Sequence, residues 1–318
     1  MMDAEERELF AKSLQQATAG TSGPALDAAL DDLGWSDALA ADPRAAVSLL
    51  FGAQGTSAST SSALDRVLLD ALGPDLPPDA GVVFPPAGRW DPPGTLAGQS
   101  VAVEGLATHR LGERDRAVVV APSGDGFVAA LVDPGDLALR PVEGIDPRLG
   151  IVAVAGQAVP AAATAPAAWV EALAAGQRAL AHELVGASRA MLGLARDHAV
   201  ERIQFGRPIA AFQAVRHRLA EALVAVEAAD AALAAGWDDP APLTAALAKA
   251  LAGRGAKTVA RHAQQVLAGI GFTTEHDLHI YVRRVLVLDQ LLGDAGSLTR
   301  RLGEDLLAER HLPSILPL

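Results

Sequence analysis

Residues 202–209 read Arg-Ile-Gln-Phe-Gly-Arg-Pro-Ile and join two strongly helical segments. The segment after them carries apolar residues at spacings of three and four, which predict a helix with one apolar face: Phe212, Val215, Leu219, Leu223 and Val226. Gly206 is typical of a helix end and Pro208 of a first helical turn. Two arginines would then lie beside a new helix N-terminus, which can hold an anion such as a pyrophosphate. The local pattern alone favours a plain helix corner with solvated charges.

Composition restricts the class of protein. The chain has 318 residues, half of them hydrophobic, no cysteine and a net charge of −12. This charge argues against a nucleic-acid partner, and the lack of cysteine excludes disulfides and thiolate metal sites. No apolar run is long enough to span a membrane, and the N-terminal residues lack the blocks of a signal peptide. We therefore expect a soluble, cytoplasmic protein without a membrane partner.

The predicted elements divide the chain into three domains and give a fold class of α+β, mainly α. Residues 1–75 read as helices over 4–17, 25–33, 43–51 and 61–72, with Gly34 and Trp35 closing the second. The stretch 55–62 is rich in Ser, Thr and Gly, which indicates either a flexible loop or an anion site at a helix start. Residues 76–160 read as a small antiparallel β domain, with strands over 100–106, 116–121, 126–132, 137–142 and 150–155.

The last domain, residues 161–318, is alanine- and leucine-rich. Its patterns predict long amphipathic helices over 168–201, 209–235, 242–267, 275–292 and 297–310. Glycines mark the breaks between them, and the connections are short. Short connections favour antiparallel neighbours, so we expect a four-helix bundle as the centre of this domain.

Two motifs carry a resemblance to a known family. The pattern Arg-x-Gln-Phe-Gly-x-Pro-Ile-x-x-Phe-Gln over 202–213 resembles a signature of the C-terminal helical domain of acyl-CoA dehydrogenases. Residues 263–273 resemble the Gln-x-x-Gly-Gly-x-Gly-Phe-Thr segment of the same family. Two motifs in the right order are more specific than either alone. The resemblance covers roughly the second half of the chain and implies an acyl-CoA dehydrogenase-like fold in a shortened member.

The resemblance also implies FAD, shared across a subunit interface. Arg202 and Gln204 would contact the FAD diphosphate of a neighbouring subunit, and Phe205 would line the ring. The adenosine and phosphate part would be contacted by Gln213, Gln265 and Gly269. The planar fork of arginine suits a phosphate because it forms two charge-assisted hydrogen bonds. Ala268 stands where the family usually has glycine, and we expect a tighter fit there.

The positions that match the family's catalytic glutamate carry no acidic residue. The resemblance implies that the glutamate acting as base in most of the family would fall at Leu292 or Gly293, and in a minority at Gly176 or a neighbouring residue. None of these side chains accepts a proton, so no catalytic residue is predicted. Asp294 is the one remaining candidate, although a role as a turn residue is favoured.

Other candidate sites are weaker still. The stretch 83–92 has lost the hydroxyls with which its family counterpart bonds the flavin ring, and the family's Lys-x-x-Ile-Thr-Asn hairpin has no equivalent. His276 and His279 lie one turn apart, but further ligands at metal-binding spacing are missing, so no metal is predicted. Arg283 and Arg284 are interpreted as a solvated or interface pair.

The chain matches the family in the residues that would contact the FAD diphosphate but not in the catalytic base or the ring pocket. This combination implies a subunit that does not catalyse alone. It resembles the shortened subunits of heteromeric (α2β2) actinobacterial acyl-CoA dehydrogenases that shorten steroid side chains. A second, catalytic subunit would supply the base, the ring pocket and most of the acyl-CoA pocket. Two alternatives stay open: a self-sufficient homo-oligomeric flavoenzyme that uses Asp294, and a non-enzymatic scaffold subunit.

Overall fold

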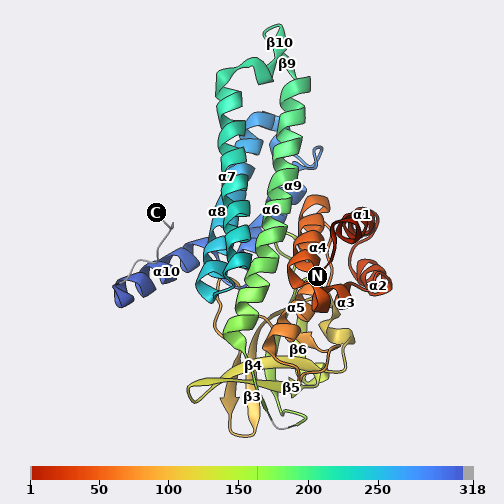
Figure 1. Ribbon diagram of the computed structural model, residues 1–318, viewed down its shortest axis with the longest axis vertical. Coiled ribbons are helices and arrows are strands. Elements are labelled where there is room, and N and C mark those ends of the chain that lie inside the picture. Colours follow the sequence, from red (N-terminus) through yellow and green to blue (C-terminus); the bar gives the residue numbers. More distant parts are fainter. Residues whose placement is uncertain (1, 163, 311–318) are drawn as a thin grey trace.

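The computed structural model describes residues 2–162 and 164–310. Helices come first, two small sheets follow, and long helices end the described chain. In Figure 1 the long helices stand upright, the sheets lie below them and the N-terminal helices pack against one side. The fold is mainly α with small, largely antiparallel sheets, as the sequence predicts. No helix within the described ranges combines the length and apolarity needed to cross a membrane.

The N-terminal helices are α1 (Ala4–Gly20), α2 (Pro24–Asp32), α3 (Trp35–Ala41), α4 (Pro43–Ser57) and α5 (Ala63–Leu72). One helix was missed and one prediction was wrong here. Gly34, in a left-handed conformation, follows the end of α2 as predicted, but α3 begins directly after it at Trp35. Gly55 was predicted to begin a loop or an anion site, but it lies inside α4. Helices α4 and α6 cross closely at this position, where a Cβ atom would clash with the carbonyl oxygen of Glu183. This glycine therefore serves helix packing and not loop flexibility.

Two four-stranded sheets form the middle of the chain, in the orders β1-β4-β5-β8 and β2-β3-β7-β6. The strands are β1 (Gly81–Val82), β2 (Gly94–Ala97), β3 (Ser100–Ala107), β4 (Ala117–Ser123), β5 (Gly126–Val132), β6 (Leu137–Pro141), β7 (Val152–Ala158) and β8 (Ala165–Pro166). The five predicted strands are confirmed; β1, β2 and β8 were missed because they are short. Pairing is antiparallel except between β1 and β4. The boundaries at 75/76 and 160/161 stay predictions.

Strand β4 shows why the sheets lie against the helices. Its side chains alternate between two cores: Val119 packs between the two sheets, whereas Val118 and Val120 join the core shared with the helices. A strand that is buried on both faces carries a continuous apolar run, here Ala117 to Ala121.

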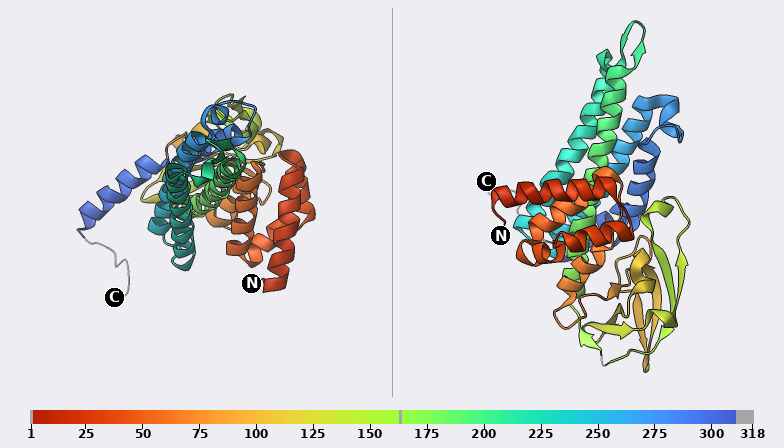
Figure 2. Two further views of the ribbon diagram at one scale, coloured as in Figure 1. Left: turned by 90° about the horizontal axis from the view of Figure 1, so that it is seen from above. Right: turned by 90° about the vertical axis from the view of Figure 1, so that its right-hand side faces the viewer.

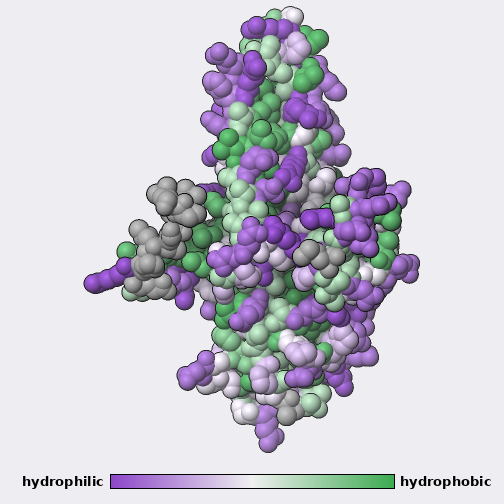
Figure 3. Space-filling view, in the orientation of Figure 1, coloured by the Kyte–Doolittle hydropathy of each residue, from purple (hydrophilic) through white to green (hydrophobic). Residues whose placement is uncertain are grey.

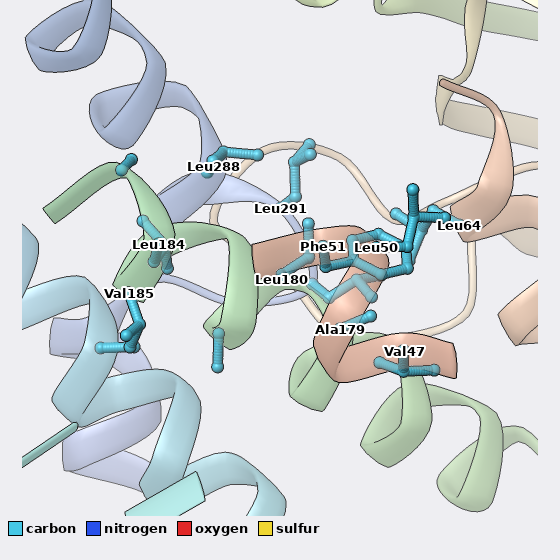
Figure 4. Close-up of a cluster of buried hydrophobic side chains, with 14 of the residues drawn as sticks. Val47, Leu50, Phe51, Leu64, Ala179, Leu180, Leu184, Val185, Leu288 and Leu291 are labelled. Carbon is cyan, nitrogen blue, oxygen red and sulfur yellow. The ribbon is translucent and has the colours of Figure 1, made fainter. Parts of the chain in front are cut away.

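The C-terminal helices are α6 (Trp169–Glu201), α7 (Gln213–Asp238), α8 (Pro242–Leu267), α9 (Leu278–Gln290) and α10 (Ala295–Glu309). Helices α6 to α9 form the bundle, and α10 projects away from it (Figures 1 and 2). Figure 4 shows how the core joins distant parts of the chain. Phe51 of α4, Leu180 of α6 and Leu288 of α9 meet there.

A hairpin of β9 (Ile203–Gln204) and β10 (Arg207–Pro208) connects α6 to α7. Its two turn residues, Phe205 and Gly206, have φ values of 54° and 76°, the left-handed combination that tight hairpins use. Gly206 and Pro208 were predicted at a helix end and in a first helical turn, but both belong to the hairpin. A 3₁₀ turn, Ile209–Ala211, follows Pro208, and α7 begins only at Gln213. The hairpin stands out at the end of the bundle opposite the sheets (Figure 2).

Candidate functional site

The hairpin end of the bundle brings the first predicted motif to the surface. Arg202, Gln204, Phe205 and Gln213 are all exposed, and 91% of the Phe205 surface is accessible. Within residues 2–162 and 164–310, no acidic side chain lies within ion-pair distance of Arg202. The hairpin thus presents an uncompensated guanidinium and an aromatic ring to whatever lies beyond this chain.

The backbone of the hairpin is firmly held. The Ile209 N–H donates to the Arg202 carbonyl at 2.8 Å, and the Arg202 N–H donates to the His198 carbonyl at 2.9 Å. The Arg207 guanidinium lies 4.4 Å from the centroid of the Phe212 ring, and Phe205 packs edge-on against the same ring at 6.0 Å. This stack braces a hairpin that would be only marginally stable alone.

The second motif lies at the C-terminal end of α8, toward the hairpin end of the bundle. Gln265 and Gly269 are exposed, and the 3₁₀ turn Ala268–Phe272 follows. Ala268 has φ 54° and ψ −135°, a conformation that glycine adopts freely and alanine does not. The alanine therefore introduces backbone strain, whereas we expected only a tighter fit at this position. The cofactor roles of Gln265 and Gly269 stay predictions.

Both positions predicted for a catalytic base meet in the interior, and both are apolar. The Leu292 side chain is fully buried, and its Cδ1 would lie 2.5 Å from a Cβ atom built on Gly176. Leu68 closes the same space from α5, at 2.9 Å. Gln177 donates a hydrogen bond to the Leu292 carbonyl at 3.0 Å. Leucine side chains thus fill the space between these two predicted positions.

Asp294 is the N-cap of α10 and not a C-terminal turn residue after Gly293. Its carboxylate accepts hydrogen bonds from the Gly296 N–H at 2.8 Å, the Ser297 N–H at 3.2 Å and the Ser297 hydroxyl. Burial alone would raise the pKa of Asp294, but these hydrogen bonds outweigh it and the pKa is lowered. A capping carboxylate with a lowered pKa is a poor general base near neutral pH.

The stretch 83–92, whose family counterpart bonds the flavin ring, is bonded to this chain's own helices. The Gly88 N–H donates to the Gln290 carbonyl at 2.8 Å, and the Ser297 hydroxyl oxygen lies 3.3 Å from the Gly88 carbonyl oxygen. The Trp169 indole N–H donates to the Trp90 carbonyl at 3.2 Å. Behind this stretch, a cavity that touches Phe84, α4, α6 and α9 has a volume of only ≈30 Å³. These residues do not fit a flavin ring.

A larger cleft of ≈610 Å³ opens between Trp90, Trp169 and α10. Most of its lining is apolar, with leucines from α6, α8 and α10. Arg301 is the one cation among the described residues that line it, and Asp305 pairs with it at 2.9 Å. The cleft can take an apolar group, but it offers no unpaired cation to a diphosphate.

Arg284 is a buried cation and not the solvated or interface residue that we predicted. It is fully buried and donates to Asp146 at 2.6 Å and to the carbonyls of Ser59 and Ala58 at 2.7 and 3.1 Å. Glu183 completes the cluster at 3.3 Å. Burial raises the pKa of Glu183 to about 7, although Arg284 opposes the shift. The cluster ties the 58–62 loop, the β region and two C-terminal helices together, so that loop is not a free anion site.

Sequence reasoning also missed Lys249, which holds the loop after α9. Its buried ammonium donates to the carbonyls of Asp289 and Gly293 at 3.0 and 3.2 Å. Burial lowers the pKa of Lys249 to about 8, against the opposing effect of Asp289. A signal was available, because Lys249 lies on the same helical stripe as Ala245, Ala252 and Ala256. A lysine on a buried stripe indicates a specific carbonyl or carboxylate partner.

The histidine pair serves local structure. The Leu278 N–H donates to the His276 ring at 3.1 Å, and the His279 ring lies 2.8 Å from the His276 carbonyl. In the part of the chain that the structure covers, no group of three or more potential ligands could hold a metal ion.

Comparison with known families agrees with this architecture. Residues 167–307 match the family described as acyl-CoA dehydrogenase, C-terminal domain. Residues 167–307 therefore form an acyl-CoA dehydrogenase C-terminal domain.

Two acyl-CoA dehydrogenases of known name are similar to part of this chain. Acyl-CoA dehydrogenase IpdE2 of Mycobacterium tuberculosis is 41% identical over 123 residues, 39% of this chain and 39% of IpdE2. FadE34 of the same organism is 43% identical over 129 residues, 38% of this chain and 18% of FadE34. The matched segment thus spans well under half the length of either relative.

Solved structures extend the likeness in fold to the whole chain. A variant of the Tcur3481–Tcur3483 steroid acyl-CoA dehydrogenase aligns with a TM-score of 0.74 and 24% identity, covering 96% of each chain. The ChsE4–ChsE5 complex from M. tuberculosis aligns with a TM-score of 0.71 and 23% identity, covering 97% of this chain and 89% of the other. The chain has the acyl-CoA dehydrogenase fold from its first helices to α10.

Proposed function

We propose that this chain is the non-catalytic subunit of a heteromeric, FAD-dependent acyl-CoA dehydrogenase. The observation that carries the proposal is the meeting of Gly176 and Leu292, which leaves both predicted positions of the base apolar and closed. A partner subunit would then supply the base and the ring pocket. The reaction class is α,β-dehydrogenation of an acyl-CoA thioester.

This chain would contribute contacts to the partner's FAD. Arg202 and Gln204 would hold the diphosphate and Phe205 would line the ring, while Gln213, Gln265 and Gly269 would contact the adenosine and phosphate part. FAD, when bound, supplies the hydride acceptor of the reaction. The exposure of these residues and the unpaired charge of Arg202 support contacts across an interface.

Exposed apolar surface on the bundle supports a partner subunit. Leu223 and Val224 of α7 are 48% and 69% exposed, and a groove of ≈440 Å³ lies between α6 and α7. Figure 3 shows hydrophobic side chains among hydrophilic ones over the upper part of the bundle. Extended apolar patches mark interaction surfaces. The ChsE4–ChsE5 and Tcur3481–Tcur3483 structures make a two-chain α2β2 assembly and a steroid side-chain CoA substrate our favoured choices.

The two alternatives make different demands. A self-sufficient flavoenzyme needs Asp294 as base, whereas its carboxylate is committed to capping α10. A scaffold subunit needs no cofactor contact, which would leave the unpaired Arg202 without a role. A non-catalytic subunit that contacts the flavin is consistent both with the capping role of Asp294 and with the unpaired Arg202.

The main test replaces Arg202 in the complex of this chain with its partner. Arg202→Ala removes a charge-assisted contact of about 1.5–3 kcal/mol, so FAD should bind roughly ten- to a hundredfold more weakly. Arg202→Lys should restore only part of the affinity, because an ammonium cannot reproduce the fork. Arg196→Ala is the matched control, since Arg196 is already paired with Asp197. Unchanged FAD retention in Arg202→Ala would favour the scaffold alternative.

A second test separates the self-sufficient enzyme. Asp294→Asn should leave turnover of the assembled complex nearly unchanged, because asparagine also caps helices well. A loss of roughly a hundredfold or more, the range of a positioned acid or base, would place catalysis in this chain. Turnover by this chain without any partner would lead to the same conclusion.

A further inference from the structure

The cleft of ≈610 Å³ between the sheets and α10 lies at the opposite end of α6 from the hairpin. Its volume is in the range of small-molecule sites, about 300–1,000 Å³. Aromatic and aliphatic side chains make up most of its lining, among them Trp90, Phe127, Trp169, Leu243 and Leu302. Aromatic side chains of this kind pack against other rings by stacking or by edge-to-face contact. The volume and the lining therefore fit an apolar molecule that carries a ring.

The charged side chains that line the cleft are already compensated. The Asp91 carboxylate lies 3.4 Å from the Arg89 guanidinium, and the Arg301 guanidinium lies 2.9 Å from the Asp305 carboxylate. Arg301 is the one cation among the described lining residues, so no charge is left for an ionic ligand. An ionic group would lose its hydration here without gaining a counter-charge, which is unfavourable. The cleft therefore favours a neutral molecule.

Gln177 offers a hydrogen-bond acceptor to the cleft. The residue is only 2% exposed, and its Nε2 donates to the Leu292 carbonyl at 3.0 Å. Because a carbonyl only accepts, this bond orients the amide with Nε2 toward Leu292 and leaves Oε1 as a free acceptor. No donor in the part of the chain that the structure describes bonds to Oε1, yet protein does not enclose this atom, and the cleft is the space that Gln177 lines. A buried acceptor is costly to leave unsatisfied, and a ligand hydroxyl can supply the donor.

From these observations we propose that the cleft binds a neutral alcohol with an apolar, ring-bearing body. The ring body packs among Trp90, Phe127 and the leucines, and the hydroxyl donates to Gln177 Oε1. The acceptor also gives selectivity, because an analogue without the hydroxyl hydrogen leaves Oε1 unpaired. This site concerns the chain by itself, so it stands or falls independently of the proposed function.

The experiment measures the dissociation constants of three matched probes by isothermal titration calorimetry on the full chain, alone or with its partner bound. The probe 2-naphthol carries the ring and the donor, 2-methoxynaphthalene lacks the donor, and 2-naphthoate carries a negative charge. We expect 2-naphthol to bind roughly threefold to tenfold more tightly than 2-methoxynaphthalene, since one hydrogen bond distinguishes them. Binding of 2-naphthoate should be weaker than that of 2-naphthol by about a hundredfold or more, because the cleft has no free cation. Tightest binding by 2-naphthoate, or no binding of 2-naphthol, would overturn the proposal.

A first variant tests the hydrogen bond. Gln177→Met removes the acceptor, so it should weaken 2-naphthol roughly threefold to tenfold and leave the binding of 2-methoxynaphthalene unchanged. Loss of the bond to the Leu292 carbonyl would by itself weaken both probes alike, so the selective loss reports the contact with the hydroxyl. Equal weakening of both probes would overturn the role of Gln177.

A second variant tests the location. Ala246→Phe fills the cleft from α8 and should strongly weaken both neutral probes. Leu247→Phe is the matched control, since it adds the same ring at the next position of α8, outside the lining. Undiminished binding of 2-naphthol to Ala246→Phe would overturn the proposed place of binding. If Ala246→Phe does not fold, the selective effect of Gln177→Met still decides.

Discussion

The hairpin end and the interior around α9 use cationic side chains in opposite ways. At the hairpin, Arg202 faces solvent, and no described carboxylate lies within ion-pair distance of it. In the interior, Lys249 beside the loop after α9 and Arg284 of α9 are fully buried, and backbone carbonyls and carboxylates satisfy them. A buried cation stabilises the fold through its hydrogen bonds, whereas an exposed cation without a partner stays available to a ligand. The two regions thus differ in that one leaves its cation open to solvent and the other encloses its cations.

The largest expected effect comes from removing a guanidinium from each region and comparing the free energies of unfolding. Arg284→Leu would leave Asp146 and Glu183 buried without their cation, and breaking a buried pair costs about 3–5 kcal/mol. Arg202→Leu should change the free energy of unfolding by less than about 0.5 kcal/mol. Urea denaturation of both variants gives the two values. Similar losses would show that the hairpin arginine is structural as well.

A smaller effect is expected on the pH dependence of stability, through the buried carboxyl group of Asp65. Burial raises the pKa of Asp65 to about 7, although hydrogen bonds from Thr108 and Val82 oppose the shift. The folded protein therefore binds a proton that the unfolded chain releases near pH 4, and stability falls as pH rises from about 4 to 7. Asp65→Asn should stabilise the protein at pH 8 by on the order of 1–3 kcal/mol and much less at pH 4. Unfolding curves at both pH values provide the measurement, and a pH-independent difference would contradict this account.

The smallest effect belongs to the exposed end. Ala268 adopts a conformation suited to glycine, so Ala268→Gly should raise the free energy of unfolding by about 0.5–1 kcal/mol. Glycine in place of alanine normally destabilises, and Ala260→Gly inside α8 provides the control with the opposite sign. Thermal unfolding of the two variants suffices. A loss of stability in Ala268→Gly would mean that the local backbone differs from this description.

Long, strongly periodic segments could be predicted, whereas close contacts could not. The bundle helices and the valine-rich strands followed from periods of 3.6 and 2, and their ends were placed within a few residues. The hairpin was missed because Gly206 and Pro208 suit helix ends as well as tight turns. Arg284 was missed because no local pattern distinguishes a solvated arginine from one that joins the 58–60 loop to Asp146.

A missing base was inferred only through the family resemblance and stays a prediction, since no physical rule makes a leucine at position 292 unusual. What the sequence could not show is that Gly176 and Leu292 touch. They are 116 positions apart, and their contact depends on how α6 crosses the end of α9. Predictions of this kind need the packing of the elements and not only their existence.

Helix α6 also has a mechanical consequence. Its 33 residues form one uninterrupted rod of about 50 Å, anchored near the sheets by Trp169 and ending at Arg202. A tilt of about 1° at the anchored end would move the other end by about 0.9 Å, more than the roughly 0.5 Å tolerance of a precise binding contact. At Gly186, α6 crosses α4 so closely that a Cβ atom would clash with the Gly52 carbonyl oxygen, and this contact constrains the angle of α6. The angle of α6, set far from the hairpin, thus determines where the Arg202 guanidinium lies.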